Sequence, residues 1–370
     1  MKLKIYTDLD LLRLGRPVDL LIPYVGTKNV EFQEGRLKEN TFKSYCENAN
    51  NYFEFTSIEE CDVCLLPINY PTLSDNTMFI SETQSFFDAV KESGKRVFIF
   101  LDTFLENYTI DIKNSIVFNR SISKSKQVLN LYSYPIFFED YIKYYNNGQL
   151  TINHKGPKPI VGFCGYTPPL GLKFGRAKIV SFLKLVANYV GIMKFFPAMS
   201  SHSFRARVLL ALQWSPSVID NFRVKQEFAF GPSGQLNRGN TTETDIDFRK
   251  NFVKNVVESD YTLGVRGLRN TSIRFYETIC CGRVPLFVNT DCVLPFDFLI
   301  DWKNLIVWVE EKNIGSTPDI LVDFHKKLTD QEFIDLQHYM RNLWDEYLSP
   351  DGFFKNLRLF LEHQEKINPS

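Results

Sequence analysis

The sequence has no surplus of either charge and no long run of apolar residues. Lys and Arg together number 43, and so do Asp and Glu, which makes the formal net charge zero. A neutral chain has no overall attraction to nucleic acid or to an anionic membrane, so any charge-driven binding must be local. No stretch approaches the roughly 20 apolar residues of a membrane span. We therefore expect no nucleic-acid partner and no transmembrane segment, and leave peripheral membrane association open.

We also expect neither a secretory leader nor a disulfide framework. The first residues, MKLKIYTDLDLL, contain neither a long apolar core nor a small-residue cleavage site. The seven cysteines are an odd number scattered through apparently regular segments, which suits a reducing compartment. Cys61 and Cys64 form a C-x-x-C without the second pair that a zinc site needs, so we expect them to pack in the core. These features predict a cytoplasmic protein with no metal site.

What the chain does contain is an alternation of short apolar runs and helical patterns. Its 370 residues, 44% of them hydrophobic, are enough for two domains with substantial cores. The expected strands are KLKIYT, CDVCLLPIN, KRVFIFLD and SIVFNRS in the first part, then PIVGFCGY, YTLGV, VPLFVN and LIVWV; the expected helices include FFDAVKES, GRAKIVSFLKLVANYV and SHSFRARVLLALQ. Such an alternation predicts parallel sheets covered by helices.

A polar break divides the two series of elements. Residues 146–159 combine Asn, Gly and two prolines with little apolar content, which is typical of a linker. We expect a first domain at 1–155, a second at 156–345, and a C-terminal helix within 346–370 that packs back on the first domain. In open parallel sheets, ligands bind at the carboxyl ends of the strands.

The stretch GVRGLRNTSIRFYETICCGRVPLFVN, residues 264–289, carries an unusual charge pattern. A helix should begin near 270–272, where Asn, Thr and Ser are all good N-cap residues. Arg266, Arg269 and Arg274 gather around that end, although a helix N-terminus is already positive and an exposed cation there costs up to roughly 1 kcal/mol. A phosphate group would reverse this balance, because free backbone N–H groups and guanidinium forks both favour an anion.

Further residues of the stretch suit a nucleotide. Gly267 would let the backbone approach a ligand closely, and Glu277 could accept hydrogen bonds from ribose hydroxyls, as acidic residues do in other nucleotide sites. The alternative is a solvated helix face on which Arg274 and Glu277 form a surface pair worth only ~0.3 kcal/mol. The residues by themselves leave both interpretations open.

The same stretch resembles the exostosin-like glycosyltransferases. Their pattern of Arg-Gly, a short loop, Ser-x-Arg-Phe-x-Glu and a later Gly-x-x-Pro-Val is similar to RGLRNTSIRFYETICCGRVPLFV here, and LPFDFLIDW follows as their Leu-Pro-Phe and Ile-x-Trp do. Further pieces agree in order: KLKIYTDL, CDVCLLPIN, VGFCGY with the later GRAKIVSFL, and LWDEYLSP. One departure is Arg96-Val97, where many relatives carry Asp-His. The resemblance spans most of the chain and is most specific in the second half.

This resemblance implies the GT-B architecture, in which two Rossmann-like α/β domains face each other across a cleft. It also implies an inverting glycosyltransferase that uses a nucleotide-sugar donor, a UDP-sugar first of all, to build a surface polysaccharide or glycan. The acceptor would be a hydroxyl of a glycan or lipid-linked glycan. By matched position, the donor residues would be Arg176, Arg266, Gly267, Asn270, Ser272, Arg274 and Glu277. No metal or other cofactor is expected.

An inverting transfer needs a general base for the acceptor hydroxyl. We expect it at the carboxyl end of a strand in the first domain, where Asp8 and Asp102 are the candidates, although each could equally be a turn or capping residue. Two D-x-D strings, at residues 8–10 and in a presumed polar loop at 245–247, are more simply explained by chance than by metal binding. The alternative function is a nucleotide- or carbohydrate-binding protein of the same fold that has lost catalysis.

Overall fold

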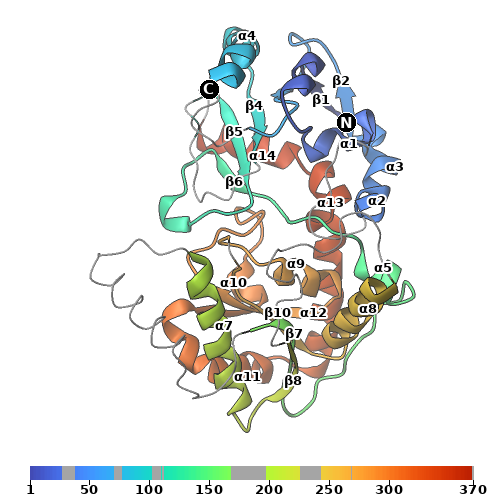
Figure 1. The fold of residues 1–370 in the computed structure, drawn as a ribbon, viewed down its shortest axis with the longest axis vertical. Helices are drawn as coiled ribbons and strands as arrows, with labels where there is room; N and C mark the ends of the chain where they lie inside the picture. Colours follow the sequence, from blue (N-terminus) through green and yellow to red (C-terminus); the bar gives the residue numbers. More distant parts are fainter. Residues whose placement is uncertain are drawn as a thin grey trace.

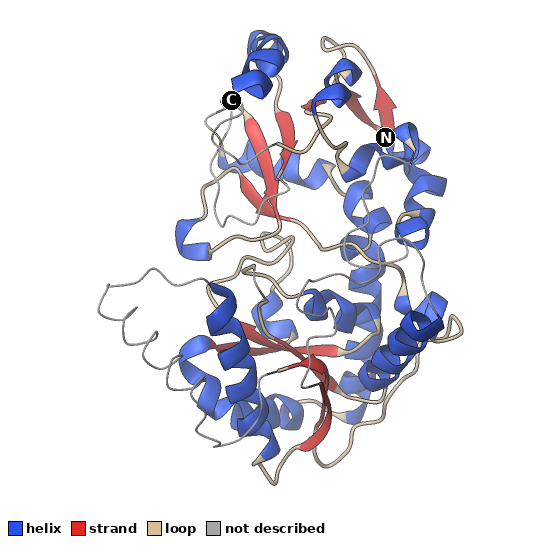
Figure 2. Cartoon of the chain, in the orientation of Figure 1, coloured by secondary structure: helices blue, strands red, loops and turns tan. Residues whose placement is uncertain are grey.

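The computed structural model describes residues 1–26, 38–70, 77–101, 110, 112–167, 197–225, 243–267 and 269–368. Two parallel sheets organise this part of the chain (Figures 1 and 2). The first contains β1 (Leu3–Tyr6), β2 (Phe53–Phe55), β3 (Val63–Leu65), β4 (Val97–Phe100), β5 (Ser115–Asn119) and β6 (Leu131–Ser133). The second contains β7 (Ile160–Tyr166), β8 (Ile219–Lys225), β9 (Tyr261–Gly264), β10 (Val284–Asn289) and β11 (Val307–Glu310).

The order of the strands is that of doubly wound sheets. The first sheet runs β2-β1-β3-β4-β5-β6 and the second β11-β10-β9-β7-β8, with every pairing parallel. In both, the chain first adds a strand on one side and then crosses to the other, as in Rossmann and flavodoxin-like folds. The predicted α/β fold with two Rossmann-like sheets, the arrangement of the GT-B class, is confirmed.

Helices accompany both sheets. The helices of the first sheet are α1 (Ile22–Val25), α2 (Lys38–Thr41), α3 (Lys43–Tyr52) and α4 (Thr77–Ser93). Helix α5 (Tyr141–Tyr145) lies in the crossover segment between the two sheets. With the second lie α7 (Pro197–Gln213), α8 (Glu243–Val257), α9 (Ile273–Cys280), α10 (Trp302–Leu305), α11 (Thr317–Lys327) and α12 (Asp330–Leu343), followed by α13 (Pro350–Lys355) and α14 (Arg358–Ile367).

Each of the eight strands expected from the sequence is present, and the three further strands in the described part of the chain are all edge strands. β2 and β6 are only three residues long, and β8 carries polar residues at Asp220, Asn221 and Arg223. Edge strands are short and polar because only one side pairs, so they lack the apolar signal of a central strand. The expected helix in 175–190 lies outside the described residues, and the presumed loop at 245–247 is wrong because these residues are part of α8.

The C-terminal helices return to the first sheet. In Figure 1, α13 and α14 lie among the elements of the first sheet although they follow the second in sequence. Their aromatic side chains make the contact: Phe118 of β5 meets Phe360 with ring centroids 5.0 Å apart and Phe353 at 6.0 Å. Phe296, in the loop after β10, packs on Phe360 at 5.0 Å. Aromatic side chains bury a large apolar area, so this cluster joins the C-terminal helices to both sheets.

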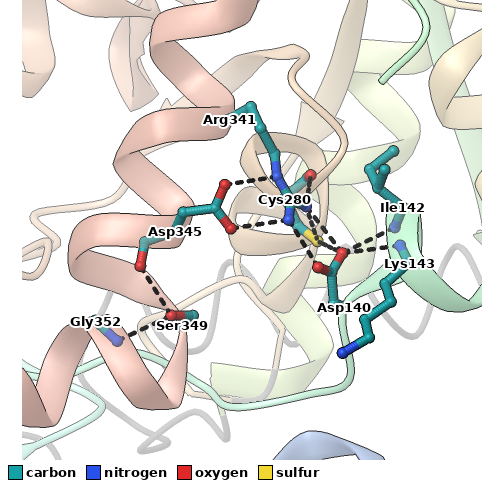
Figure 3. Close-up of polar contacts among 8 residues, drawn as sticks. All are labelled: Asp140, Ile142, Lys143, Cys280, Arg341, Asp345, Ser349 and Gly352. Carbon is teal, nitrogen blue, oxygen red and sulfur yellow. Dashed lines mark hydrogen bonds and ion pairs between the residues drawn. The ribbon is translucent and has the colours of Figure 1, made fainter. Parts of the chain in front are cut away.

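A charged clamp holds the crossover segment against the second sheet (Figure 3). Arg341 of α12 donates to both oxygens of Asp140, with distances of 2.9 and 2.7 Å, and to the carbonyl oxygen of Cys280 at 2.9 Å. Its remaining N–H groups reach Asp345 at 2.9 and 2.8 Å. Burial by itself would lower the pKa of Arg341, but the hydrogen bonds that it donates to Asp140 and the nearby acidic groups outweigh burial and raise the pKa.

Asp140 has a second role in the clamp. Its Oδ1 accepts hydrogen bonds from the backbone N–H groups of Ile142 and Lys143, at 3.0 and 3.2 Å, and so caps α5. Because Cys280 is the last residue of α9, the clamp joins the start of α5 to the end of α9. One guanidinium thus fixes two helix ends at once.

Replacing Arg341 by Met should destabilise the protein by about 3 kcal/mol, because Asp140 would stay half-buried without its counter-charge. Only 15% and 18% of the two side chains are exposed. As a matched control, Arg223→Met removes an arginine from a surface pair with Glu258, in which 37% and 45% of the side chains are exposed; it should cost less than about 1 kcal/mol. Urea unfolding of both variants measures this, and equal losses would contradict the role of the clamp.

Candidate functional site

The topology of the second sheet marks one place for a ligand. The chain passes from β7 to β8 on one side and then to β9, β10 and β11 on the other, so the winding reverses between β7 and β9. In doubly wound sheets, ligands bind at the carboxyl ends of the strands beside such a reversal. The residues that follow β9 are the arginine-rich loop 265–272, and β7 ends with Gly165 and Tyr166.

The loop leads into α9 as the sequence predicts, and Ser272 is the N-cap residue. Its backbone is extended, with φ −131° and ψ 117°, but its side chain makes no capping hydrogen bond. The backbone N–H of Gly267 bonds to the carbonyl of Thr271 at 3.2 Å and closes the loop. A Cβ at Gly267 would meet no atom within 4 Å, so packing does not require glycine there. The space beside Gly267 and the hydroxyl of Ser272 are therefore compatible with a bound ligand.

Arg274 lies in the first turn of α9 in aromatic surroundings. Its guanidinium carbon is 5.2 Å from the ring centroid of Phe163 and 5.8 Å from that of Phe252. Its Nε is buried without a hydrogen bond, and it forms no ion pair with a described residue. Gly165 makes room for it: φ is +154°, and a Cβ there would collide with Nη2 of Arg274. The protein thus holds a cation beside rings and backbone without supplying a described acid.

A second arginine, which the sequence reading missed, joins Arg274. Arg205 of α7 lies with its guanidinium carbon 5.9 Å from the Phe163 ring. Burial and, after it, the positive charge of Arg274 lower the pKa of Arg205 to about 10. Two guanidinium groups that repel each other in a partly desolvated place favour an anion between them. In sequence, Arg205 is one of two arginines on the helix α7, and only the packing of α7 shows that Arg205 lies near Arg274.

Glu277 is buried, so the alternative of a solvated helix face is wrong. Only 3% of the residue is exposed. Its Oε1 accepts a hydrogen bond from the hydroxyl of Tyr141 at 2.8 Å and lies 4.0 Å from Nη1 of Arg249. The surface pair with Arg274 that the sequence allowed is replaced by this interior contact. Burying a carboxylate is costly unless it is hydrogen-bonded and paired, which is what Tyr141 and Arg249 provide.

Asn270 is occupied by protein contacts. Its side-chain nitrogen donates to the carbonyl oxygens of Ile122 and Asp291 and to the hydroxyl of Ser123, at 3.2–3.3 Å. Its side-chain oxygen accepts from the hydroxyl of Thr290 at 2.8 Å, and only 1% of the residue is exposed. The structure therefore gives Asn270 a positioning role: it joins the arginine loop to the segment after β5 and to the segment after β10. Direct contact with a donor stays a prediction.

Among the remaining predicted residues, Arg266 is half-buried at the start of the loop, while Arg176 and Asp102 lie outside the described residues. Asp8 follows β1, and the first sheet reverses its winding between β1 and β3, so Asp8 stands at the corresponding ligand position of that sheet. Its Oδ1 also caps the 3₁₀ helix Leu9–Leu14 by accepting from the N–H of Asp10 at 3.0 Å. Both the functional and the capping interpretation of Asp8 thus remain.

The other sequence features have plain structural roles. Cys61 and Cys64 are buried thiols with their sulfurs 4.0 Å apart, and none of the seven cysteines forms a disulfide. Within the described ranges, no group of three or more His, Cys, Asp or Glu side chains is placed to hold a metal ion. No helix in those ranges is long and apolar enough to cross a membrane.

Comparison with known proteins gives relatives of one kind. No family model matches the chain. It is 29% identical over 113 residues to Exostosin-1 of Drosophila melanogaster, covering 30% of this chain and 14% of that protein. It is 32% identical over 93 residues to an Exostosin-1 homolog of Caenorhabditis elegans, covering 25% and 23%, and 25% identical over 118 residues to a probable arabinosyltransferase of Arabidopsis thaliana, covering 31% and 26%. Each match thus spans about a quarter or less of the relative's length.

Solved structures show only a distant likeness. An α-glucosyltransferase in complex with UDP-glucose and DNA has a TM-score of 0.36 at 11% identity, with 98% of this chain and 99% of that one covered. TarM of S. aureus, in complex with fondaparinux, α-GlcNAc-glycerol and UDP, has a TM-score of 0.28 at 12% identity, covering 86% and 53%. Scores this low carry no argument. The sequence relatives confirm the predicted resemblance of this chain to the exostosin-like glycosyltransferases.

Proposed function

We propose that this protein is an inverting glycosyltransferase that moves a sugar from a UDP-sugar to a hydroxyl of a glycan or lipid-linked glycan acceptor. The observation that carries the proposal is the pair of Arg205 and Arg274 at the carboxyl end of β7. Burial and, after it, the positive charge of Arg274 lower the pKa of Arg205, and a diphosphate between the two arginines would replace their repulsion by two charge-assisted contacts.

Arg205 and Arg274 would also supply the positive charge that the leaving group of the reaction needs. When the glycosidic bond of the donor breaks, negative charge develops on the leaving diphosphate, and preorganised cations lower the energy of that transition state. Arg266, Ser272 and the N-terminus of α9 would add further contacts to the phosphate oxygens. Because guanidinium groups neutralise the diphosphate, we propose that the transfer needs no metal ion.

The acceptor side belongs to the first sheet. An inverting transfer requires in-line attack, so the base must lie on the side of the donor sugar opposite the leaving diphosphate. We propose Asp8 for this role, because it stands where the first sheet reverses its winding. Its Oδ1 is engaged in the cap of the 3₁₀ helix, which leaves Oδ2 to accept the proton of the acceptor hydroxyl.

The direct test is a panel of nucleotides and nucleotide sugars in a thermal-shift assay, followed by assays of transfer and hydrolysis with each sugar nucleotide that binds. A ligand at 100 times its Kd stabilises the folded state by ~2.7 kcal/mol. Binding of UDP with sugar turnover supports the enzyme. Binding without turnover for any acceptor or water would instead support a protein that has lost catalysis.

Arg274→Gln should weaken UDP binding by roughly 1.5–3 kcal/mol, the scale of a hydrogen bond to a charged group. Arg205→Gln should cause a loss of similar size, because both arginines would contact the diphosphate. Arg223→Gln, on the exposed side of β8, serves as the matched control and should bind UDP normally. Isothermal titration calorimetry measures all three, and unchanged UDP affinity in the Arg274 variant would remove the basis of the donor site.

Glu277→Gln should weaken the binding of UDP while leaving that of pyrophosphate unchanged. The reason is that the carboxylate is assigned to the ribose hydroxyls, and a neutral amide is a weaker acceptor. The two ligands share the diphosphate and differ in the nucleoside, so the ratio of their affinities isolates the ribose contact. Equal losses for both ligands would contradict this assignment.

Asp8→Asn should lower kcat by roughly 10²–10⁴ with donor binding intact, as expected for loss of a general base. Asparagine caps a helix as well as aspartate does, so the 3₁₀ helix after β1 should be preserved. Asp10→Asn, two residues on and exposed, is the control and should turn over normally. Normal turnover in the Asp8 variant would place the base elsewhere.

A further inference from the structure

A chain of hydrogen bonds ends on Glu277. Nη1 of Arg249, in α8, lies 2.6 Å from the hydroxyl oxygen of Tyr141, and that hydroxyl lies 2.8 Å from Oε1 of Glu277. An arginine can only donate, so the Tyr141 oxygen accepts from Arg249 and its single hydrogen points to Glu277. The chemistry of the three groups therefore fixes the direction of the chain and requires Glu277 to be the acceptor.

The other side of Arg249 is held by a second carboxylate. Its Nε lies 3.7 Å from Oε1 of Glu139, which also accepts from the hydroxyl of Tyr145 at 3.1 Å. Glu139 is 1% exposed, and its Oε2 is buried without a hydrogen bond. Burial by itself would lower the pKa of Arg249, but Tyr141, Glu139 and Glu277 outweigh it and raise the pKa. Arg249 thus remains a cation shared between two carboxylates.

We propose that Tyr141 and Arg249 are positioning residues for nucleoside recognition: they hold Oε1 of Glu277 so that Oε2 faces the ribose hydroxyls of the donor. The inference rests on the proposed function, since it gives Glu277 a ribose to bind. Tyr141 belongs to α5 in the crossover segment, so a residue between the two sheets sets the orientation of a side chain in the donor site.

The Tyr141 hydroxyl acts as a spacer between opposite charges. Nη1 of Arg249 is 4.0 Å from Oε1 of Glu277, at the limit of a direct ion pair, while the hydroxyl bonds to both. Without it, the attraction between guanidinium and carboxylate would draw Glu277 toward Arg249 and away from a ligand, because Coulomb interactions strengthen at short range in partly desolvated surroundings. Removal of one hydroxyl should therefore affect recognition more than stability.

The test compares Tyr141→Phe with wild-type protein for binding of UDP and of pyrophosphate by isothermal titration calorimetry. Tyr141→Phe should weaken UDP binding about 10-fold, the scale of one hydrogen bond to a charged group, and leave pyrophosphate binding unchanged. Tyr145→Phe is the matched control, because it removes a hydroxyl of the same network that bonds to Glu139 and interacts with Arg249 but makes no hydrogen bond to Glu277. It should leave the ratio of the two affinities as in wild type. Arg249→Lys, whose single ammonium nitrogen cannot occupy both the position of Nε beside Glu139 and that of Nη1 beside Tyr141, should show the same UDP-selective loss as Tyr141→Phe.

The outcomes separate this inference from the proposed function. Failure of the wild-type protein to bind either ligand would overturn the donor site and the inference with it. Normal wild-type binding, combined with unchanged UDP affinity in Tyr141→Phe or equal losses for both ligands, would overturn the inference alone. A UDP-selective loss in Tyr145→Phe as large as that in Tyr141→Phe would also overturn it, because the effect would then belong to the buried network as a whole.

Discussion

Helix α9 is eight residues long, and its residues from Phe275 to Cys280 are all buried. A charged side chain in such a buried stretch must be met by protein or by a ligand. α9 carries two charges, Glu277 inside the buried stretch and Arg274 in the partly buried first turn. Glu277 is met by Tyr141 and Arg249, whereas Arg274 faces rings, backbone and a second arginine. That difference between the two charges is the reason for placing an anion at Arg274.

The surroundings of α9 come from distant parts of the chain. Three consecutive residues of the crossover segment, 139–141, contact Arg249 and Arg341 as well as Glu277. Arg341 also bonds to the carbonyl of Cys280, the last residue of α9. The crossover segment therefore contacts α9 at Glu277 and at its C-terminus. Contacts of Asn270 with the segment after β5 hold the loop at the opposite end.

Much of the fold could be predicted because its central strands carry a clear apolar pattern. β2, β6 and β8 could not, since edge strands pair on one side only and tolerate polar residues. Arginines posed a similar problem. Arg283 lies in the same motif as Arg274, yet it is fully buried and bonds to Gln337, Asn153 and the carbonyl of Val257. Residue type and spacing cannot distinguish this structural arginine from one that faces a ligand.

The sequence by itself determined the two α/β sheets, the position of the arginine loop before α9, a helix start within residues 270–272, and the resemblance to exostosin-like glycosyltransferases. These depend on local pattern and on motifs that are contiguous in the chain. Only the tertiary structure decided that Arg205 lies beside Arg274, that Glu277 is buried against Tyr141, and that Asn270 is a positioning residue. Each of these depends on contacts between residues far apart in sequence, and periodicity within one segment carries no information about which distant side chain will pack against it.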